Sequence, residues 1–262
     1  MTRLLQVSDA HFGTERPQVV EALVSLSSRL APHLLVLSGD LTQRARRSQF
    51  AAAAAFVRRL AIPGLLAIPG NHDLPLFDLV TRAVAPYARY LQAFGPELEP
   101  RFSASDCLVL GVKTTRRYRH TDGEISLEQR ESIADALRAA RPEQARIIVL
   151  HQPIAVPRLS EVQNVVHGAE AAIVAWHDAG ADIILGGHIH LPFVLPLHEL
   201  RSLPRPLWAV NAGTAVSSRI RHDAGNSVNV LDVVARRRVE LQQWTYREAA
   251  GEFVLGATLQ LG

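Results

Sequence analysis

The chain has 262 residues, of which 48% are hydrophobic and 20% are charged, and its formal net charge is +3. This composition is typical of a folded globular protein and excludes a disordered chain, and no apolar run reaches the ~20 residues that a membrane-spanning helix needs. Cys107 is the only cysteine, which excludes a disulfide framework and a thiolate metal site.

The first part of the chain alternates between short apolar runs and segments with helical periodicity. The runs that predict strands lie at 4–7, 34–37, 65–68, 107–112, 147–150 and 183–185. The segments that predict helices lie at 17–30, 48–60, 77–94, 126–140 and 169–179. The third of these helices is expected to break or kink near Pro86, and the fourth begins with a capping box formed by Ser126 and Gln129.

The pattern changes after residue 190. Short runs that predict antiparallel strands lie at 194–197, 207–210, 228–233, 239–246 and 253–259. Parallel units followed by such strands, with no linker between them, predict a second sheet packed on the first. The sequence contains no Gly/Ser-rich linker, low-complexity segment or internal repeat, so we expect one domain, 1–262.

Polar motifs follow the predicted strands. In chain order they are Asp9-x-His11, Gly39-Asp40, Gly70-Asn71-His72-Asp73, His151 and Gly187-His188-Ile189-His190. Strands deliver the residues at their C-terminal ends to one edge of a sheet, so we expect these side chains to converge. Imidazole with carboxylate and amide oxygen is a ligand set for borderline divalent or trivalent metals. Each motif alone is weak, but all of them in this order predict a two-metal hydrolase.

These ordered motifs resemble those of the calcineurin-like metallophosphoesterases: Asp-x-His, Gly-Asp, Gly-Asn-His-Asp/Glu, His and Gly-His-x-His. The resemblance runs from about residue 3 to about residue 215 and implies an α/β fold, a four-layer αββα sandwich with two central mixed β-sheets. It implies one metal held by Asp9, His11, Asp40 and His190. It implies a second metal held by Asp40, Asn71, His151 and His188. It further implies that Asp40 bridges the metals and that His72 is the catalytic histidine rather than a ligand.

Phosphodiester hydrolysis explains why these residue types are needed. A phosphodiester anion repels nucleophiles, and two metal ions about 3.5–4 Å apart neutralise it and generate a bridging hydroxide near neutral pH. The O and N ligands predict Mn, Fe or Zn as the metals. We expect His72 to protonate the departing alkoxide or to stabilise transition-state charge, and Asp73 to fix the ring and tautomer of that histidine.

Departures from related groups narrow the substrate class. The third motif ends in Asp73, and Asp40 is not followed by the Asp-Arg-Gly of the phosphoprotein phosphatases. The segment Asn211-Ala212-Gly213-Thr214, followed by Ser217, Ser218 and Arg219, fits the class III cyclic-nucleotide phosphodiesterases and their broad-specificity bacterial relatives, to which the chain is most similar. That resemblance implies hydrolysis of small phosphodiesters, such as cyclic nucleotides or glycerophosphodiesters. A metal-dependent nuclease and a non-catalytic interaction module of the same fold are the alternatives.

A segment rich in Arg at 113–124 follows a predicted strand that should end near the site. One interpretation is a substrate loop, in which Arg116 and Arg117 bind phosphate and Tyr118 stacks on a base or sugar. The other interpretation is a solvated charged loop that precedes the helix at 127–140. The sequence does not distinguish between them.

The expected partner is a small anionic phosphoester substrate, which a modest positive charge suits. The charge falls short of the basic stripe of a dedicated nucleic-acid binder, and no membrane contact is expected. The chain runs directly into its first strand and first ligand, so we expect no signal peptide and a cytoplasmic location. The oligomeric state stays open, and a homo-oligomer is compatible with the sequence.

Overall fold

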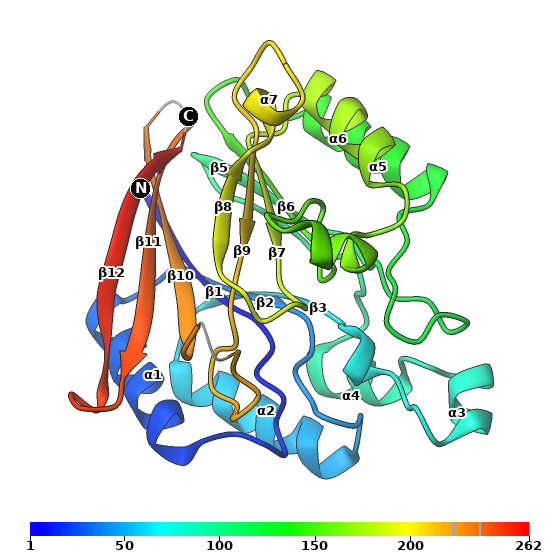
Figure 1. Ribbon diagram of the computed structural model, residues 1–262, viewed down its shortest axis with the longest axis vertical. Coiled ribbons are helices and arrows are strands. Elements are labelled where there is room, and N and C mark those ends of the chain that lie inside the picture. The colour runs from blue at the N-terminus through cyan, green and yellow to red at the C-terminus, as the bar shows by residue number, and fades with distance from the viewer. Residues whose placement is uncertain (222–223, 236, 262) are drawn as a thin grey trace.

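Two β-sheets pack face to face in the computed structural model, and helices cover both outer faces (Figure 1). The structure describes residues 1–221, 224–235 and 237–261. The predicted fold class, an αββα sandwich with two mixed sheets, is confirmed. Within the described residues, no helix combines the length and the apolar character that crossing a membrane requires.

The first sheet has the strand order β12-β11-β10-β1-β2-β3. Its parallel half consists of β1 (Thr2–Val7), β2 (Leu34–Ser38) and β3 (Gly64–Ile68). Its antiparallel half consists of β10 (Ser227–Ala235), β11 (Arg238–Arg247) and β12 (Glu252–Leu261). The outer face of the parallel half is covered by α1 (Pro17–Leu30) and α2 (Arg47–Leu60).

The second sheet has the strand order β4-β5-β6-β7-β9-β8. Its strands are β4 (Arg101–Ser103), β5 (Cys107–Gly111), β6 (Ala145–Val149), β7 (Ile183–Gly186), β8 (Phe193–Pro196) and β9 (Trp208–Asn211). The four inner strands are parallel, and β4 and β8 are antiparallel edges. The outer face is covered by α5 (Leu127–Arg138) and α6 (Ala169–Asp178).

Alternation along the strands builds the layers, because successive side chains of a strand point to opposite faces. In β2, Leu35 and Leu37 pack against the helices, whereas Leu34 and Val36 pack between the two sheets. All four side chains are buried, which explains why this strand is a continuous apolar run rather than an alternating one.

Two predictions about the chain path are corrected. The strands after residue 190 do not form a second sheet by themselves: β8 and β9 extend the sheet of β4–β7, with β9 parallel to β7, and β10–β12 extend the first sheet. The predicted helix at 77–94 is two short helices, α3 (Leu79–Val84) and α4 (Ala88–Phe94), because Pro86 lies between them. Short elements that the sequence did not indicate are β4, α7 (Leu197–Leu200) and the 3₁₀ helices Asn71–Asp73 and Leu159–Asn164.

Candidate metal centre

The structure brings the seven predicted metal ligands together at the C-terminal ends of parallel strands. They follow β1, β2 and β3 of the first sheet and β6 and β7 of the second: Asp9, His11, Asp40, Asn71, His151, His188 and His190. The sequence predicted convergence on one sheet edge. Both sheets contribute, so the site lies where their edges meet.

Two glycines allow the strand ends to approach closely. A Cβ atom on Gly70 would overlap the backbone nitrogen and the carboxylate of Asp40. A Cβ atom on Gly187 would overlap the Ser8 hydroxyl and the Asp9 carboxylate. Neither position accepts a larger residue unless a carboxylate moves, which explains why glycine occupies both.

Several of the predicted ligands have a strained backbone. Left-handed φ angles of 43–71° occur at Asp9, His11, Asp40, His188 and His190. Residues other than glycine rarely adopt this conformation, which costs about 1–3 kcal/mol each and persists where the surrounding structure imposes it. Such strain concentrates at functional sites, so the backbone independently indicates that this loop cluster is one.

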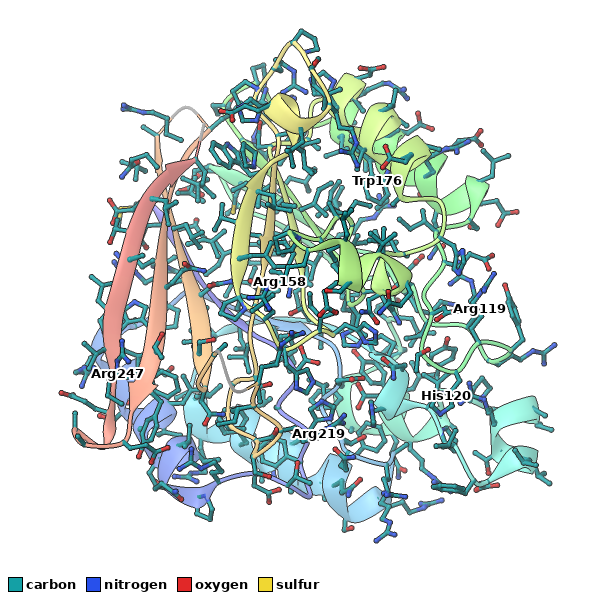
Figure 2. All side chains as sticks on the ribbon, viewed as in Figure 1. Arg119, His120, Arg158, Trp176, Arg219 and Arg247 are labelled. Carbon is teal, nitrogen blue, oxygen red and sulfur yellow. The ribbon has the colours of Figure 1, made fainter. Side chains whose placement is uncertain are left out.

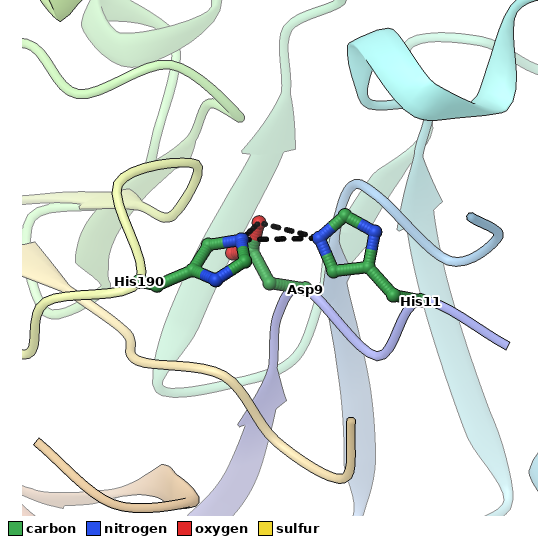
Figure 3. A group of neighbouring side chains, drawn as sticks. All are labelled: Asp9, His11 and His190. Carbon is green, nitrogen blue, oxygen red and sulfur yellow. Dashed lines mark hydrogen bonds and ion pairs between the residues drawn. The ribbon is translucent and has the colours of Figure 1, made fainter. Parts of the chain in front are cut away.

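The first group of ligand atoms is formed by Asp9, His11 and His190 (Figure 3). Asp9 Oδ1 lies 3.3 Å from His190 Nε2 and 3.7 Å from His11 Nε2, and the two Nε2 atoms are 3.1 Å apart. The other carboxylate oxygen, Oδ2, accepts hydrogen bonds from the Ser8 hydroxyl and the His188 backbone N–H. The carboxylate is therefore fixed through Oδ2, and Oδ1 is left to face the histidines.

The second group consists of Asp40, His151 and His188, with Asn71 beside it. His151 Nε2 lies 3.3 Å from Asp40 Oδ1 and 3.1 Å from Asn71 Oδ1. The other carboxylate oxygen of Asp40, Oδ2, lies 3.7 Å from His11 Nε2 in the first group. Asp40 thus has one oxygen directed at each group.

The donor set of this site fits metal ions. His151 Nδ1 lies 2.9 Å from the Ser38 carbonyl oxygen and donates its hydrogen there, so Nε2 faces the oxygens of Asp40 and Asn71, with its lone pair directed at them whenever the ring is neutral. Acceptors that face one another repel unless a cation lies among them. Within the described part of the chain, buried Asp9 Oδ1 and His188 Nδ1 also have no hydrogen-bond partner. Unpaired buried oxygen and imidazole nitrogen atoms are what a borderline metal binds.

The electrostatics of the site are consistent with cation binding. Burial alone would raise the pKa of the Asp9 and Asp40 carboxyl groups. The neighbouring His190 instead holds the pKa of Asp9 well below its usual range, and His151 does the same for Asp40. Burial would lower the pKa of His151, but the Asp40 carboxylate outweighs it and raises that pKa to about 9. Burial lowers the pKa of His11 to about 3. A metal and a proton compete for the same lone pair of His151, so metal binding is coupled to proton release.

The predicted catalytic residue, His72, lies beside both groups, and its ring nitrogen is within 4.8 Å of ligand atoms of His11 and Asp40. Its Nδ1 lies 2.9 Å from the carbonyl oxygen of Gln43, to which it donates. Its Nε2 lies 3.2 Å from Nη1 of Arg219 and accepts from it. A guanidinium at Nε2 is incompatible with a metal on the same atom, because the two cations repel.

The prediction that Asp73 fixes the ring of His72 is wrong. The Asp73 carboxylate accepts hydrogen bonds from the backbone N–H groups of Leu41, Thr42 and Gly70 at 2.8–3.1 Å, and from the Thr42 hydroxyl. Burial, followed by the charge of Asp40, raises the pKa of this carboxyl to about 6. Asp73 therefore joins the loops after β2 and β3, and the contact that orients His72 comes from a backbone carbonyl.

The predicted substrate loop also differs from expectation. The guanidinium of Arg116 donates to the carbonyl oxygens of Lys113 and Thr115 and to Gln129, and that of Arg117 donates to the Ala83 carbonyl. Tyr118 is exposed, and its hydroxyl donates to Glu124. These polar groups are used to hold the loop together and to attach it to α3.

A hollow of about 150 Å³ opens beside His72. Its apolar lining comes from Leu74, Leu76 and Phe77, and its polar lining includes Arg44, Arg82 and His120. The loop at 113–124 therefore does reach the hollow, but through His120 instead of Arg116, Arg117 or Tyr118.

Sequence reasoning did not identify Gln43 or Arg219 as site residues. Gln43 acts through its carbonyl oxygen, which any residue possesses. Arg219 lies between β9 and β10 (Figure 2), far in sequence from the histidines that it contacts. The available signal was that Arg219 belongs to the pattern, beginning at Asn211, that resembles the cyclic-nucleotide phosphodiesterases, although that pattern assigned it no role in the site.

Comparisons with known proteins agree with this geometry. Residues 2–192 match the family model of the calcineurin-like phosphoesterases, and the chain belongs to that family. A probable cyclic nucleotide phosphodiesterase of Synechococcus sp. is 25% identical over 183 residues, which cover 68% of this chain and 65% of that protein.

Two solved structures are similar in fold. A purple acid phosphatase from yellow lupin seeds has a TM-score of 0.74 at 15% identity and covers 99% of this chain, which in turn covers 53% of that chain. A dimetal phosphatase from Danio rerio has a TM-score of 0.71 at 11% identity, and the match covers 99% of this chain and 98% of that one. At these identities the likeness concerns the fold.

Replacing Gly70 with alanine tests whether close approach of the loops positions Asp40. The added Cβ must displace the Asp40 carboxylate, so we expect metal affinity to fall by about 10–100-fold, the usual effect of disturbing the support of a ligand. Bound metal is measured by elemental analysis after dialysis against a metal buffer. Gly256→Ala in β12, where the nearest atom to the new Cβ is 3.4 Å away, is the control. Equal metal affinity in both variants would contradict the assignment.

Replacing Asp73 with alanine separates its structural role from the catalytic role that the sequence suggested. The substitution leaves buried backbone N–H groups without an acceptor, and each costs about 1–3 kcal/mol. We therefore expect a lower free energy of unfolding, measured by urea denaturation. A variant of wild-type stability whose only defect is in the pH–rate profile would restore the original interpretation.

Proposed function

We propose that the protein is a two-metal phosphodiesterase that hydrolyses small phosphodiesters. The observation that carries this proposal is the placement of Asp40: one carboxylate oxygen lies 3.3 Å from His151 Nε2 and the other 3.7 Å from His11 Nε2. A carboxylate with its two oxygens directed at separate histidine groups suits a bridge between two metal ions. Membership of a phosphoesterase family supports the same reading.

We assign the ligands by the two groups. One metal is held by Asp9, His11, Asp40 and His190, and the other by Asp40, Asn71, His151 and His188. The O and N donors suit Mn, Fe or Zn, and availability selects among them. When bound, the two metals neutralise the phosphate and lower the pKa of the attacking water.

His72 acts on the leaving group in this proposal. The Gln43 carbonyl accepts from its Nδ1 and fixes the tautomer, so Nε2 is the atom that exchanges a proton. The hollow beside His72 is where the departing alcohol is expected to lie. A proton delivered from Nε2 neutralises the developing alkoxide, which typically accelerates such a step by about 10²–10⁴-fold.

The lining of this hollow favours diesters over monoesters. A diester carries a second substituent and needs surface for it, which a monoester does not. Phe77 supplies an apolar aromatic face, and the Arg44 guanidinium lies over it at 5.5 Å from the ring centroid. Such a surface suits the base of a cyclic nucleotide, or the alkyl part of a glycerophosphodiester. The distant resemblance to a probable cyclic nucleotide phosphodiesterase supports the first of these.

Variants of Asp40 and His72 separate a ligand from a catalyst. The wild-type protein is expected to bind two metal ions per chain. Asp40→Ala is expected to lose both metals and activity, because the carboxylate serves both groups. His72→Ala is expected to keep both metals and to lose about 10²–10⁴-fold in kcat. Metal content is measured by elemental analysis, and kcat with bis(p-nitrophenyl) phosphate.

If His72→Ala loses metal as readily as Asp40→Ala, the division of roles fails. Full activity of wild-type protein after exhaustive chelation would overturn the metal-dependent mechanism itself.

Matched monoester and diester pairs test the substrate class. We expect kcat/KM to be higher for cyclic nucleotides and glycerophosphodiesters than for the matched phosphomonoesters. Single-stranded DNA is assayed in the same panel. Phe77→Ala is expected to raise KM more than it lowers kcat for a natural diester, because its contact is remote from the phosphorus. Tyr118→Ala, whose hydroxyl binds Glu124, is the matched control and should change little. Faster cleavage of monoesters would overturn the class, and preferential cleavage of DNA would favour a nuclease.

A further inference from the structure

Arg219 reaches the centre of the site from a segment that carries none of the predicted ligands. It lies between β9 and β10, and its side chain is partly buried. Its Nη1 atom lies 3.2 Å from His72 Nε2, 3.1 Å from Gln43 Oε1 and 3.4 Å from His11 Nδ1. The guanidinium is therefore placed between a proposed metal ligand and the proposed catalytic histidine.

The contact with His11 does not survive metal binding in its present form. When His11 binds a metal through Nε2, its Nδ1 carries the ring hydrogen and cannot accept a hydrogen bond from Arg219. The guanidinium is then left with the Gln43 side chain as acceptor, and with His72 only while Nε2 of that ring carries no proton. Metal binding at His11 thereby frees an N–H group of Arg219, beside the proposed metal centre, to donate to another acceptor.

Most of the donor capacity of Arg219 is unused. A guanidinium has five N–H donors in a planar fork. Across the residues that the structure describes, every hydrogen bond from this guanidinium uses Nη1. Nε and Nη2 are available, and Arg219 lines a second open hollow together with His188, His190 and Arg221.

We propose that Arg219 binds a non-bridging phosphoryl oxygen of the substrate and stabilises its charge in the transition state. This role rests on the proposed function and adds a fixed cation that the two metals do not supply. A planar fork matches the geometry of phosphate oxygens better than an ammonium group does. Because the contact is to the phosphoryl group, its contribution is independent of the leaving alcohol.

The backbone of Arg219 has a separate structural role. Its carbonyl oxygen accepts hydrogen bonds from His190 Nδ1 and from the Thr214 hydroxyl. A side-chain substitution leaves that carbonyl in place, so His190 stays oriented. Metal content therefore distinguishes loss of the guanidinium from collapse of the metal centre.

The test uses Arg219→Gln and Arg219→Lys in the metal-loaded, full-length protein. The first measurement is the Kd of inorganic phosphate by calorimetry, which does not require turnover. We expect Arg219→Gln to weaken phosphate binding by about 10–100-fold, with both metals retained, and Arg219→Lys to recover part of that loss. Arg201→Gln removes an arginine that binds Glu170 on the surface, and it is the charge-matched control.

The second measurement compares methyl p-nitrophenyl phosphate with methyl phenyl phosphate. Arg219→Gln is expected to lower kcat/KM by about 10²–10³-fold for both, the usual loss for one transition-state donor. His72→Ala is expected to lower kcat/KM more for methyl phenyl phosphate than for methyl p-nitrophenyl phosphate, because phenol is the poorer leaving group and depends more on protonation. Unchanged phosphate affinity and kcat/KM, or loss of metal in both Arg219 variants, would overturn the role of Arg219. An inactive wild-type protein that still binds phosphate through Arg219 would instead refute the proposed function alone.

Discussion

The site depends on two carboxylates, Asp9 and Asp40, that are buried where the two sheets meet. Removing a charge from water costs several kcal/mol unless opposite charge or hydrogen bonds compensate. The protein supplies part of this compensation through His190 and His151, which hold the carboxyl pKa values low. Under the proposed function, metal ions supply the rest of the compensation, at acceptor atoms such as Asp9 Oδ1 that have no hydrogen-bond partner among the described residues. Gathering these groups in one buried place requires the loops to approach closely, as the contacts of Gly70 and Gly187 show.

Hydrogen bonds across the two sheets fix the distances within the site. The Gln6 side chain in β1 donates to the Gly186 carbonyl in β7, and His151 Nδ1 donates to the Ser38 carbonyl in β2. The backbone N–H of His188 donates to the Asp9 carboxylate. Each of these bonds joins one sheet to the other directly beneath or within the ligand groups. A displacement between the sheets would therefore separate the ligands, so packing of the sandwich core and geometry of the site are coupled.

The residues predictable from sequence were those whose position follows from local rules. An apolar strand that ends in Gly39-Asp40 or Gly187-His188 places polar side chains at a sheet edge, wherever the sheet lies. The pairing of strands was less predictable, because the apolar patterns of β8 and β9 do not specify which sheet they join. The contact of Gln43 with His72 was hidden because it uses a backbone carbonyl, and a sequence pattern carries no record of that group.

The arginines at 116–119 show a further limit. Their composition indicates phosphate binding, but their partners are set by tertiary structure. Arg117 donates to the Ala83 carbonyl, and Arg82 of α3 donates in return to the carbonyls of Arg117 and Arg119. The sequence alone does not distinguish an arginine that donates to backbone carbonyls from one that binds phosphate. Only the structure distinguishes these from Arg219, whose Nη1 faces the rings of His11 and His72.

The site has two parts that differ in burial. The proposed metal ligands are mostly buried and follow strand ends. The lining near His72 comes mainly from the segment that leads from His72 to Phe77, and is completed by Arg82 of α3 and by His120 of the loop at 113–124. Hydrogen bonds of Arg82 and Arg117 tie α3 to that loop. Phe77, which lines that hollow, is 74% exposed. Binding surfaces on loops change with little effect on a rigid scaffold. Under the proposed function, the residues that hold the metals are constrained by the sandwich core, whereas the exposed lining near His72, such as Phe77, would select the alcohol and could vary without disturbing Asp9 or Asp40.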